Sequence, residues 1–154
     1  MGKFQSSKVF DGFSTVFRQH TAETTHCRFV HGYGISFKIY FEGKLDQRNW
    51  VWDFGGMKRA TTKIDGKSPK EWMDFMFDHT LIVAEDDPFK NAFIEMGEAG
   101  AAQVRIIPAT GAEKFAEYIF NKVNEFVIKE TEGRVEVIKV KFMEHGKNAA
   151  YYVA

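Results

Sequence analysis

The chain has 154 residues, a length that fits one domain with a substantial hydrophobic core. Its 21 basic residues balance 21 acidic ones without a long run of either sign, which argues against nucleic acid or an anionic membrane as the main partner. Neither a signal-peptide pattern nor the roughly 20 apolar residues of a membrane helix occurs, so we expect a cytoplasmic protein. The single cysteine, Cys27, cannot form an internal disulfide and fits a reducing compartment.

Two β-strands are predicted in the first third of the chain. Residues 8–20 are rich in β-branched and aromatic side chains. Residues 27–41 alternate with a period of two, and their odd positions become apolar from Ile35 onward. An antiparallel pairing of these strands would bring His20, at the end of the first, near His31 in the second.

One face of the second predicted strand carries a thiol, an imidazole and a phenol. On a regular strand Cys27, His31 and Tyr33 would all project from the face that continues as an apolar wall. Such a row is either a metal or catalytic site or an unspecialised polar strand end beside a loop. His20 and His31 could supply two of the three donors that a catalytic zinc needs.

Helices are predicted in the middle of the chain. Ser68, Pro69 and Glu71 form a cap, a first-position proline and a glutamate three residues after the cap, which predicts a helix from Pro69 to about Phe77. A second helix is predicted over residues 88–98, followed by a short strand over residues 104–107.

The longest helix is predicted after Thr110. Thr110 and Glu113 have the spacing of a capping box, and helical periodicity continues to about Lys129. The buried face is predicted to consist of apolar side chains at helical spacing, namely Phe115, Ile119, Val123, Phe126 and Val127.

Two more strands are predicted at the end, over residues 134–144 and 149–153, the first with an ambiguous phase near its start. Glu144 falls on the side of Val140 and Phe142, where a charged group needs a partner or lies beyond the core. The order of strands, helices and strands predicts one α+β domain over residues 1–154, with helices packed on one face of an antiparallel sheet.

Histidines provide a further signal, because all five fall at the ends of predicted elements. Asp78 directly precedes His79, so a carboxylate is placed beside an imidazole that could act as a general acid or base. An Asp-His pair at a helix end is also typical of a cap or of a contact with the helix dipole. The five histidines are His20, His26, His31, His79 and His145.

Five separated motifs together resemble the family of 6-pyruvoyl-tetrahydropterin and 6-carboxy-tetrahydropterin synthases, over nearly the whole chain. The short Cys-x-x-x-His interval is similar to that of the bacterial carboxy enzymes of queuosine and deazaguanine biosynthesis. The motifs are Phe13-Ser-x-x-Phe-Arg-Gln-His20, Cys27-x-x-x-His31-Gly, Trp52-Asp-Phe54 with Met57-Lys, Phe77-Asp-His79, and Glu144 with Asn148-Ala-Ala-Tyr151.

The resemblance implies a tunnelling fold (T-fold), in which a four-stranded antiparallel sheet with helices on its outer side assembles into a ring, commonly a homohexamer, with active sites between subunits. It also implies a zinc-dependent lyase that converts 7,8-dihydroneopterin triphosphate to 6-carboxy-tetrahydropterin and releases acetaldehyde and triphosphate. Alternatives are pyruvoyl formation, another side-chain cleavage of a pterin, or a non-catalytic pterin-binding homologue.

Residue roles follow from the same resemblance. Cys27 would be the thiolate base, Asp78 and His79 the proton-relay pair, and Glu144 the carboxylate that holds the pterin. The Zn²⁺ ligands would be at the motif positions His20, His31 and Tyr33.

Tyr33 departs from the family pattern His-Gly-His. A phenol has a pKa near 10, so it ligates zinc at neutral pH less readily than imidazole does. Three alternatives remain: Tyr33 is the third ligand, His26 replaces it, or the metal site is weakened or lost. The presence of Cys27, His79 and Glu144 favours a retained metal.

Overall fold

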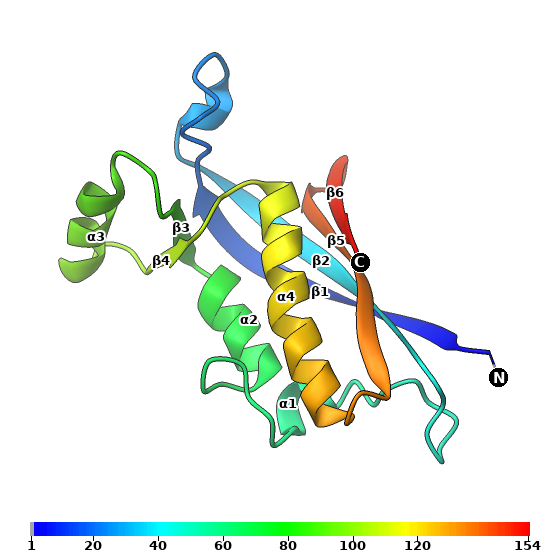
Figure 1. Ribbon diagram of the computed structural model, residues 1–154. Helices are drawn as coiled ribbons and strands as arrows, with labels where there is room; N and C mark the ends of the chain where they lie inside the picture. Colours follow the sequence, from blue (N-terminus) through cyan, green and yellow to red (C-terminus); the bar gives the residue numbers. More distant parts are fainter. Residues whose placement is uncertain (1) are drawn as a thin grey trace.

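A computed structural model describes residues 2–154 and contains one sheet of six strands in the order β4-β3-β1-β2-β5-β6 (Figure 1). Pairing is antiparallel among β1, β2, β5 and β6, whereas β3 and β4 extend the β1 edge in parallel. The expected four-stranded antiparallel sheet is therefore one side of a larger, six-stranded one. The strands are β1 (Phe4–Phe17), β2 (His31–Gly43), β3 (Thr80–Ala84), β4 (Val104–Ile107), β5 (Val135–His145) and β6 (Asn148–Val153).

The helices α2 and α4 cover one face of this sheet, and α3 lies off to one side (Figure 1). None of the residues of α3 is buried, which agrees with its position beyond the core. Within residues 2–154 no helix is both long and apolar enough to cross a membrane. The helices are α1 (Gly56–Arg59), α2 (Pro69–Phe77), α3 (Lys90–Glu98) and α4 (Ala112–Glu130), with a 3-10 turn, η1 (His26–Arg28), before β2.

The predicted limits of α2 are confirmed, but the predicted cap of α4 is wrong. Ser68 caps α2 by accepting a hydrogen bond from the Glu71 N–H at 3.2 Å. At α4 the cap position is Gly111, whose φ of +116° suits glycine, and the Gln19 side chain lies where a Cβ would be. Thr110 instead donates its hydroxyl to the Arg18 carbonyl at 2.7 Å, so it joins α4 to the end of β1.

The core lies between the sheet and α4, and the predicted buried face of that helix is confirmed in all five positions. Its centre is a group of phenylalanine rings contributed by different elements. Phe115 of α4 contacts Phe17 of β1 at 4.8 Å and Phe142 of β5 at 5.2 Å between ring centroids. Phe77, at the end of α2, contacts the same Phe115 at 6.2 Å. Edge and tilted ring contacts of this kind fix the helices over the strands.

Two bulges interrupt the alternation of the strands, and the one in β5 explains the ambiguous phase of residues 134–144. In β1 the register shifts between Phe10 and Phe13, so both side chains point into the core although they are three residues apart. In β5 a register shift around Ile138 turns Val137 and Val140 to the same side. Each extra residue inverts the alternation, and a strict period of two cannot predict that.

The predicted start of the second strand is wrong. β2 begins at His31 rather than at Cys27, and Cys27 lies in η1. β1 also ends at Phe17, so His20 lies three residues beyond it. His20 of the first motif and Cys27 of the second therefore occupy a loop that projects beyond one end of the sheet (Figure 1).

Candidate functional site

The candidate site lies at the end of the β1–β2 ladder, where Phe17 of β1 pairs with His31 of β2. The loop between them closes on itself, because the Gln19 N–H donates to the Cys27 carbonyl at 2.8 Å. Thr25 caps η1 by accepting the Cys27 N–H at 3.2 Å. Cys27 is thus held by its backbone in a turn, with its side chain partly buried.

His31 and Tyr33 face each other across this end of β2. The Nδ1–H of His31 donates to the Phe29 carbonyl at 2.7 Å, and its Nε2 contacts the Tyr33 hydroxyl. The Tyr33 ring stacks on Phe17 with 4.8 Å between centroids, which fixes its direction. Because Nδ1 carries the proton, Nε2 has a free lone pair, and this lone pair is directed toward the Tyr33 hydroxyl.

The charges around Tyr33 show which other residues are close. Burial, together with the negative charges of Glu144 and Cys27, raises the pKa of Tyr33 to about 12. The phenol is therefore protonated at neutral pH unless a cation is bound beside it. Glu144, near the end of β5, and Cys27, in its turn, therefore lie near the same ring although they belong to two elements.

His20 lies in a second group of charges that sequence reasoning did not assign. Its Nε2 is 3.6 Å from a carboxylate oxygen of Asp86. The neighbouring Asp87 is almost fully buried and makes a two-point ion pair with Arg18, with both N···O distances at 2.8 Å. Arg18 also donates to the Arg28 carbonyl at 2.9 Å, which ties the end of β1, the η1 turn and the acidic loop together.

No local pattern could have revealed this group, because its members are about seventy positions apart in sequence. The hydrogen bonds from Arg18, together with one from the Phe89 N–H, hold the pKa of Asp87 below its usual range against the opposing effect of burial. A carboxylate that is buried and ionised in this way holds the segments around it in place, and the sequence could not indicate this role.

Asp78 and His79 form the predicted pair. The Nδ1 of His79 is 3.0 Å from an Asp78 carboxylate oxygen, and the Ser14 N–H donates to the same carboxylate at 3.2 Å. The Ser14 hydrogen bond and then the His79 contact lower the pKa of Asp78 despite some desolvation. His79 has a positive φ of 55° and a side chain that is 76% exposed, so its Nε2 is free to exchange protons with a bound molecule.

Asp78 and His79 lie on the other side of β1 from Tyr33. Both contact the Ser14 backbone of β1, and the next residue, Thr15, pairs with Tyr33 of β2. Within residues 2–154 no hydrogen bond or ion pair joins Asp78 or His79 to the Tyr33 group. His31 contacts Tyr33 directly, and Cys27 and Glu144 lie close enough to affect its pKa.

The donors fit a metal ion in part. Within residues 2–154 no three His, Cys, Asp or Glu side chains lie close enough to hold one. His31 Nε2 and the Tyr33 hydroxyl lie in contact. The hydrogen bond from His31 Nδ1 to the Phe29 carbonyl is of the kind that metal-bound histidines usually make with their other ring nitrogen. His20 could complete the set from the loop beside them, while His26 is exposed and its ring lies against Phe29.

Residues 7–154 match the sequence model of a protein family described as 6-pyruvoyl tetrahydropterin synthase. No curated protein sequence matches the chain. Among solved structures, an uncharacterized protein from Wolinella succinogenes is similar with a TM-score of 0.75 and 19% identity, over 99% of each chain.

Two enzymes with the family's name also have this fold. The 6-pyruvoyl tetrahydropterin synthase of Caenorhabditis elegans has a TM-score of 0.63 and 19% identity, over 100% of this chain and 97% of that one. The Plasmodium vivax enzyme of the same name has a TM-score of 0.63 and 14% identity, over 97% of both chains. At such identities the structural similarity establishes the fold alone.

Proposed function

Because the chain belongs to the 6-pyruvoyl tetrahydropterin synthase family, we propose that it is a pterin lyase acting on 7,8-dihydroneopterin triphosphate. The proposed products are 6-carboxy-tetrahydropterin, acetaldehyde and triphosphate, as in queuosine and deazaguanine biosynthesis. The alternative is a 6-pyruvoyl-tetrahydropterin product, which the names of two structural neighbours favour.

The observation that best supports the proposal is the grouping of a thiol and a carboxylate around one ring. Cys27 and Glu144 both raise the pKa of Tyr33, which indicates that the two side chains lie near its ring. A carboxylate can accept two parallel hydrogen bonds from the guanidine-like edge of a pterin. Glu144 would thus orient the substrate, and Cys27, as thiolate, would remove a carbon-bound proton from its side chain.

A divalent ion, Zn²⁺, is part of this proposal. His31 Nε2 and the Tyr33 oxygen would hold it, with His20 as the third ligand. When bound, zinc polarises the side-chain hydroxyls of the substrate and makes the neighbouring protons more acidic. Removal of the Tyr33 proton accompanies metal binding, because only the phenolate is a ligand.

Asp78 and His79 would relay a further proton to or from the substrate. The carboxylate fixes His79 with Nδ1 protonated, so the exposed Nε2 can accept or return a proton. Because β1 lies between the pair and the Tyr33 group in one chain, we propose that the pair serves the site of a neighbouring subunit in a ring, as in a homohexamer.

The proposal is tested by incubating the purified protein with 7,8-dihydroneopterin triphosphate, with and without added zinc. We expect turnover that a chelator abolishes and zinc restores, with acetaldehyde formed in equal amount to the pterin product. Turnover without acetaldehyde would identify the pyruvoyl reaction. Pterin binding without any turnover would leave only a binding function.

A further inference from the structure

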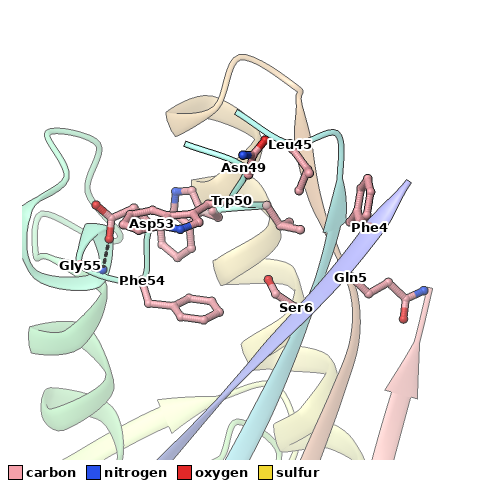
Figure 2. Close-up of a pocket in the computed structure, with 11 residues that line it drawn as sticks. Phe4, Gln5, Ser6, Leu45, Asn49, Trp50, Asp53, Phe54 and Gly55 are labelled. Atoms are coloured by element: carbon pink, nitrogen blue, oxygen red, sulfur yellow. Dashed lines mark hydrogen bonds between the residues drawn. The ribbon is translucent and has the colours of Figure 1, made fainter. Parts of the chain in front are cut away.

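A hollow of about 490 Å³ lies at the other end of the β1–β2 ladder, where Phe4 pairs with Gly43 (Figure 2). It is formed by the first residues of β1 and by residues 45–55, which follow β2. β1 runs from the hollow, at Phe4 to Ser6, to the candidate site at Phe17, a distance of roughly 40 Å along the strand. None of the residues assigned to the pterin site lines it.

The walls of this hollow are aromatic and firmly supported on one side. Trp52 is 7% exposed and packs against Phe41 of β2 and Phe126 of α4, at 5.3 and 5.8 Å between centroids. Phe54 lies edge-on to Trp52 at 6.2 Å. These rings form a floor that is continuous with the core, so the hollow does not need to be created by a ligand.

The rim carries two aromatic side chains that are open to solvent. Phe4 is 53% exposed and Trp50 is 48% exposed. The Arg48 guanidinium lies over the Trp50 ring at 4.4 Å and is itself held by Asp46, so one face of the indole is fixed. Exposed aromatic rings around a preformed apolar hollow are typical of a stacking site for a planar molecule.

Ser6 provides a polar group inside this apolar lining. Its hydroxyl oxygen is buried and has no hydrogen-bond partner among residues 2–154. Figure 2 shows Ser6 pointing from β1 toward the space between Phe54 and Leu45. A buried hydroxyl without a partner is unfavourable, so a molecule in the hollow with one donor or acceptor would gain a hydrogen bond there.

The charges of the hollow do not favour an anionic ligand. Its lining contains no lysine or arginine, its one charged residue is Asp53, and the cations beside it, Arg48 and Lys8, lie over the Trp50 and Phe54 rings. That carboxylate is already occupied, by the Gly55 N–H at 2.8 Å and by Arg48 at 3.2 Å. The lining has no cation to pair with a triphosphate, and its one carboxylate is already paired and is not available to a cationic ligand. The charge pattern therefore fits a neutral ligand.

We propose that this hollow is a binding site for a neutral, planar aromatic molecule of one or two rings, which stacks on Trp50 and forms a hydrogen bond with the Ser6 hydroxyl. The volume lies within the range of small-molecule pockets, and it is large enough for such a ring system. The site is independent of the pterin chemistry at the other end of the sheet.

Titration calorimetry of the full chain with indole and with 1-methylindole tests this proposal. Indole can donate its N–H to Ser6, whereas 1-methylindole cannot. We expect saturable binding of indole, and Trp50→Ala should weaken it about tenfold through the loss of stacking. Ser6→Ala should reduce the preference for indole over 1-methylindole by about fivefold, the value of one hydrogen bond.

Phe75→Ala is the matched control, because Phe75 is also an exposed aromatic residue and lines neither this hollow nor the candidate site. It should bind indole as the unaltered chain does. The proposal is overturned if indole does not saturate the protein up to its solubility limit, or if Trp50→Ala and Phe75→Ala bind alike. Sedimentation of Trp50→Ala gives a further check. If this variant changes the mass of the oligomer but leaves indole binding unchanged, a second copy of the chain covers the hollow, and the proposal is overturned.

Discussion

At the scale of single residues, Tyr33 is the most informative position. Its environment contains His31, Cys27 and Glu144, so three of the expected site residues are close to it without any metal to draw them together. The tyrosine replaces an imidazole by a group that must lose a proton before it can bind a cation. The main consequence of this replacement is therefore a dependence of metal affinity on pH.

Zinc affinity should accordingly increase with pH more steeply in the unaltered chain than in Tyr33→His. Between pH 7 and 9 the two slopes should differ by about a factor of ten per pH unit. The reason is that a phenol whose pKa is about 12 must release one proton per zinc bound, whereas a histidine is already neutral in this range. Competition with a chromophoric chelator measures both slopes. Equal slopes would remove Tyr33 from the ligand set.

Cys27→Ala should lower turnover of the pterin triphosphate at least about a hundredfold, because the general base is lost. Binding of the substrate should remain nearly unchanged, since Glu144 and not Cys27 is proposed to hold the pterin. Single-turnover kinetics and equilibrium dialysis separate these two effects. A variant that turns over at the original rate would show that another group is the base.

At the scale of elements, the sequence predicted the best-capped helix and the longest one well, since α2 agrees at both ends and α4 in its buried face. It did not predict β3, because Leu81 to Ala84 is a short apolar run that is buried on both sides and has no alternation to distinguish a strand. The start of β2 was misplaced for a related reason. The alternation of polar and apolar residues continues through the η1 turn, although the backbone there is not extended.

The contact between β1 and the acidic loop was equally unpredictable from sequence, and it has a measurable effect. Asp87→Asn should reduce the free energy of unfolding by about 3 kcal/mol at pH 7, because it leaves the largely buried Arg18 without its ionic partner. Urea denaturation at several pH values measures this difference. Glu85→Gln, in the same loop but exposed, is the control and should have little effect.

The pH dependence of that difference has a definite sign. Hydrogen bonds from Arg18 depress the pKa of Asp87 in the folded chain, so its stabilising contribution is complete above the ordinary carboxyl pKa near 4. It is lost as the pH falls through the lower folded value, where the protonated aspartate resembles asparagine. The two curves should therefore converge in acid. A constant difference down to low pH would contradict the ion-pair explanation.

At the scale of the whole molecule, the motifs predicted the family correctly, but they did not predict how the expected site residues are arranged in space. In one chain β1 lies between the Asp78–His79 pair, which contacts Ser14, and Tyr33 of β2. This arrangement depends on strand order, which local patterns do not contain.

The separation predicts complementation between inactive variants. Cys27→Ala and His79→Ala should each be inactive alone, whereas subunits mixed by coexpression should recover activity at about a quarter of the sites, if each site takes its thiol from one subunit and its imidazole from another. The fraction follows because half of the thiols and half of the imidazoles are intact and they combine at random. Mixed oligomers with no activity would mean that both groups serve the same subunit's site, and the chain would then have to move β1 or the loop after it to bring them together.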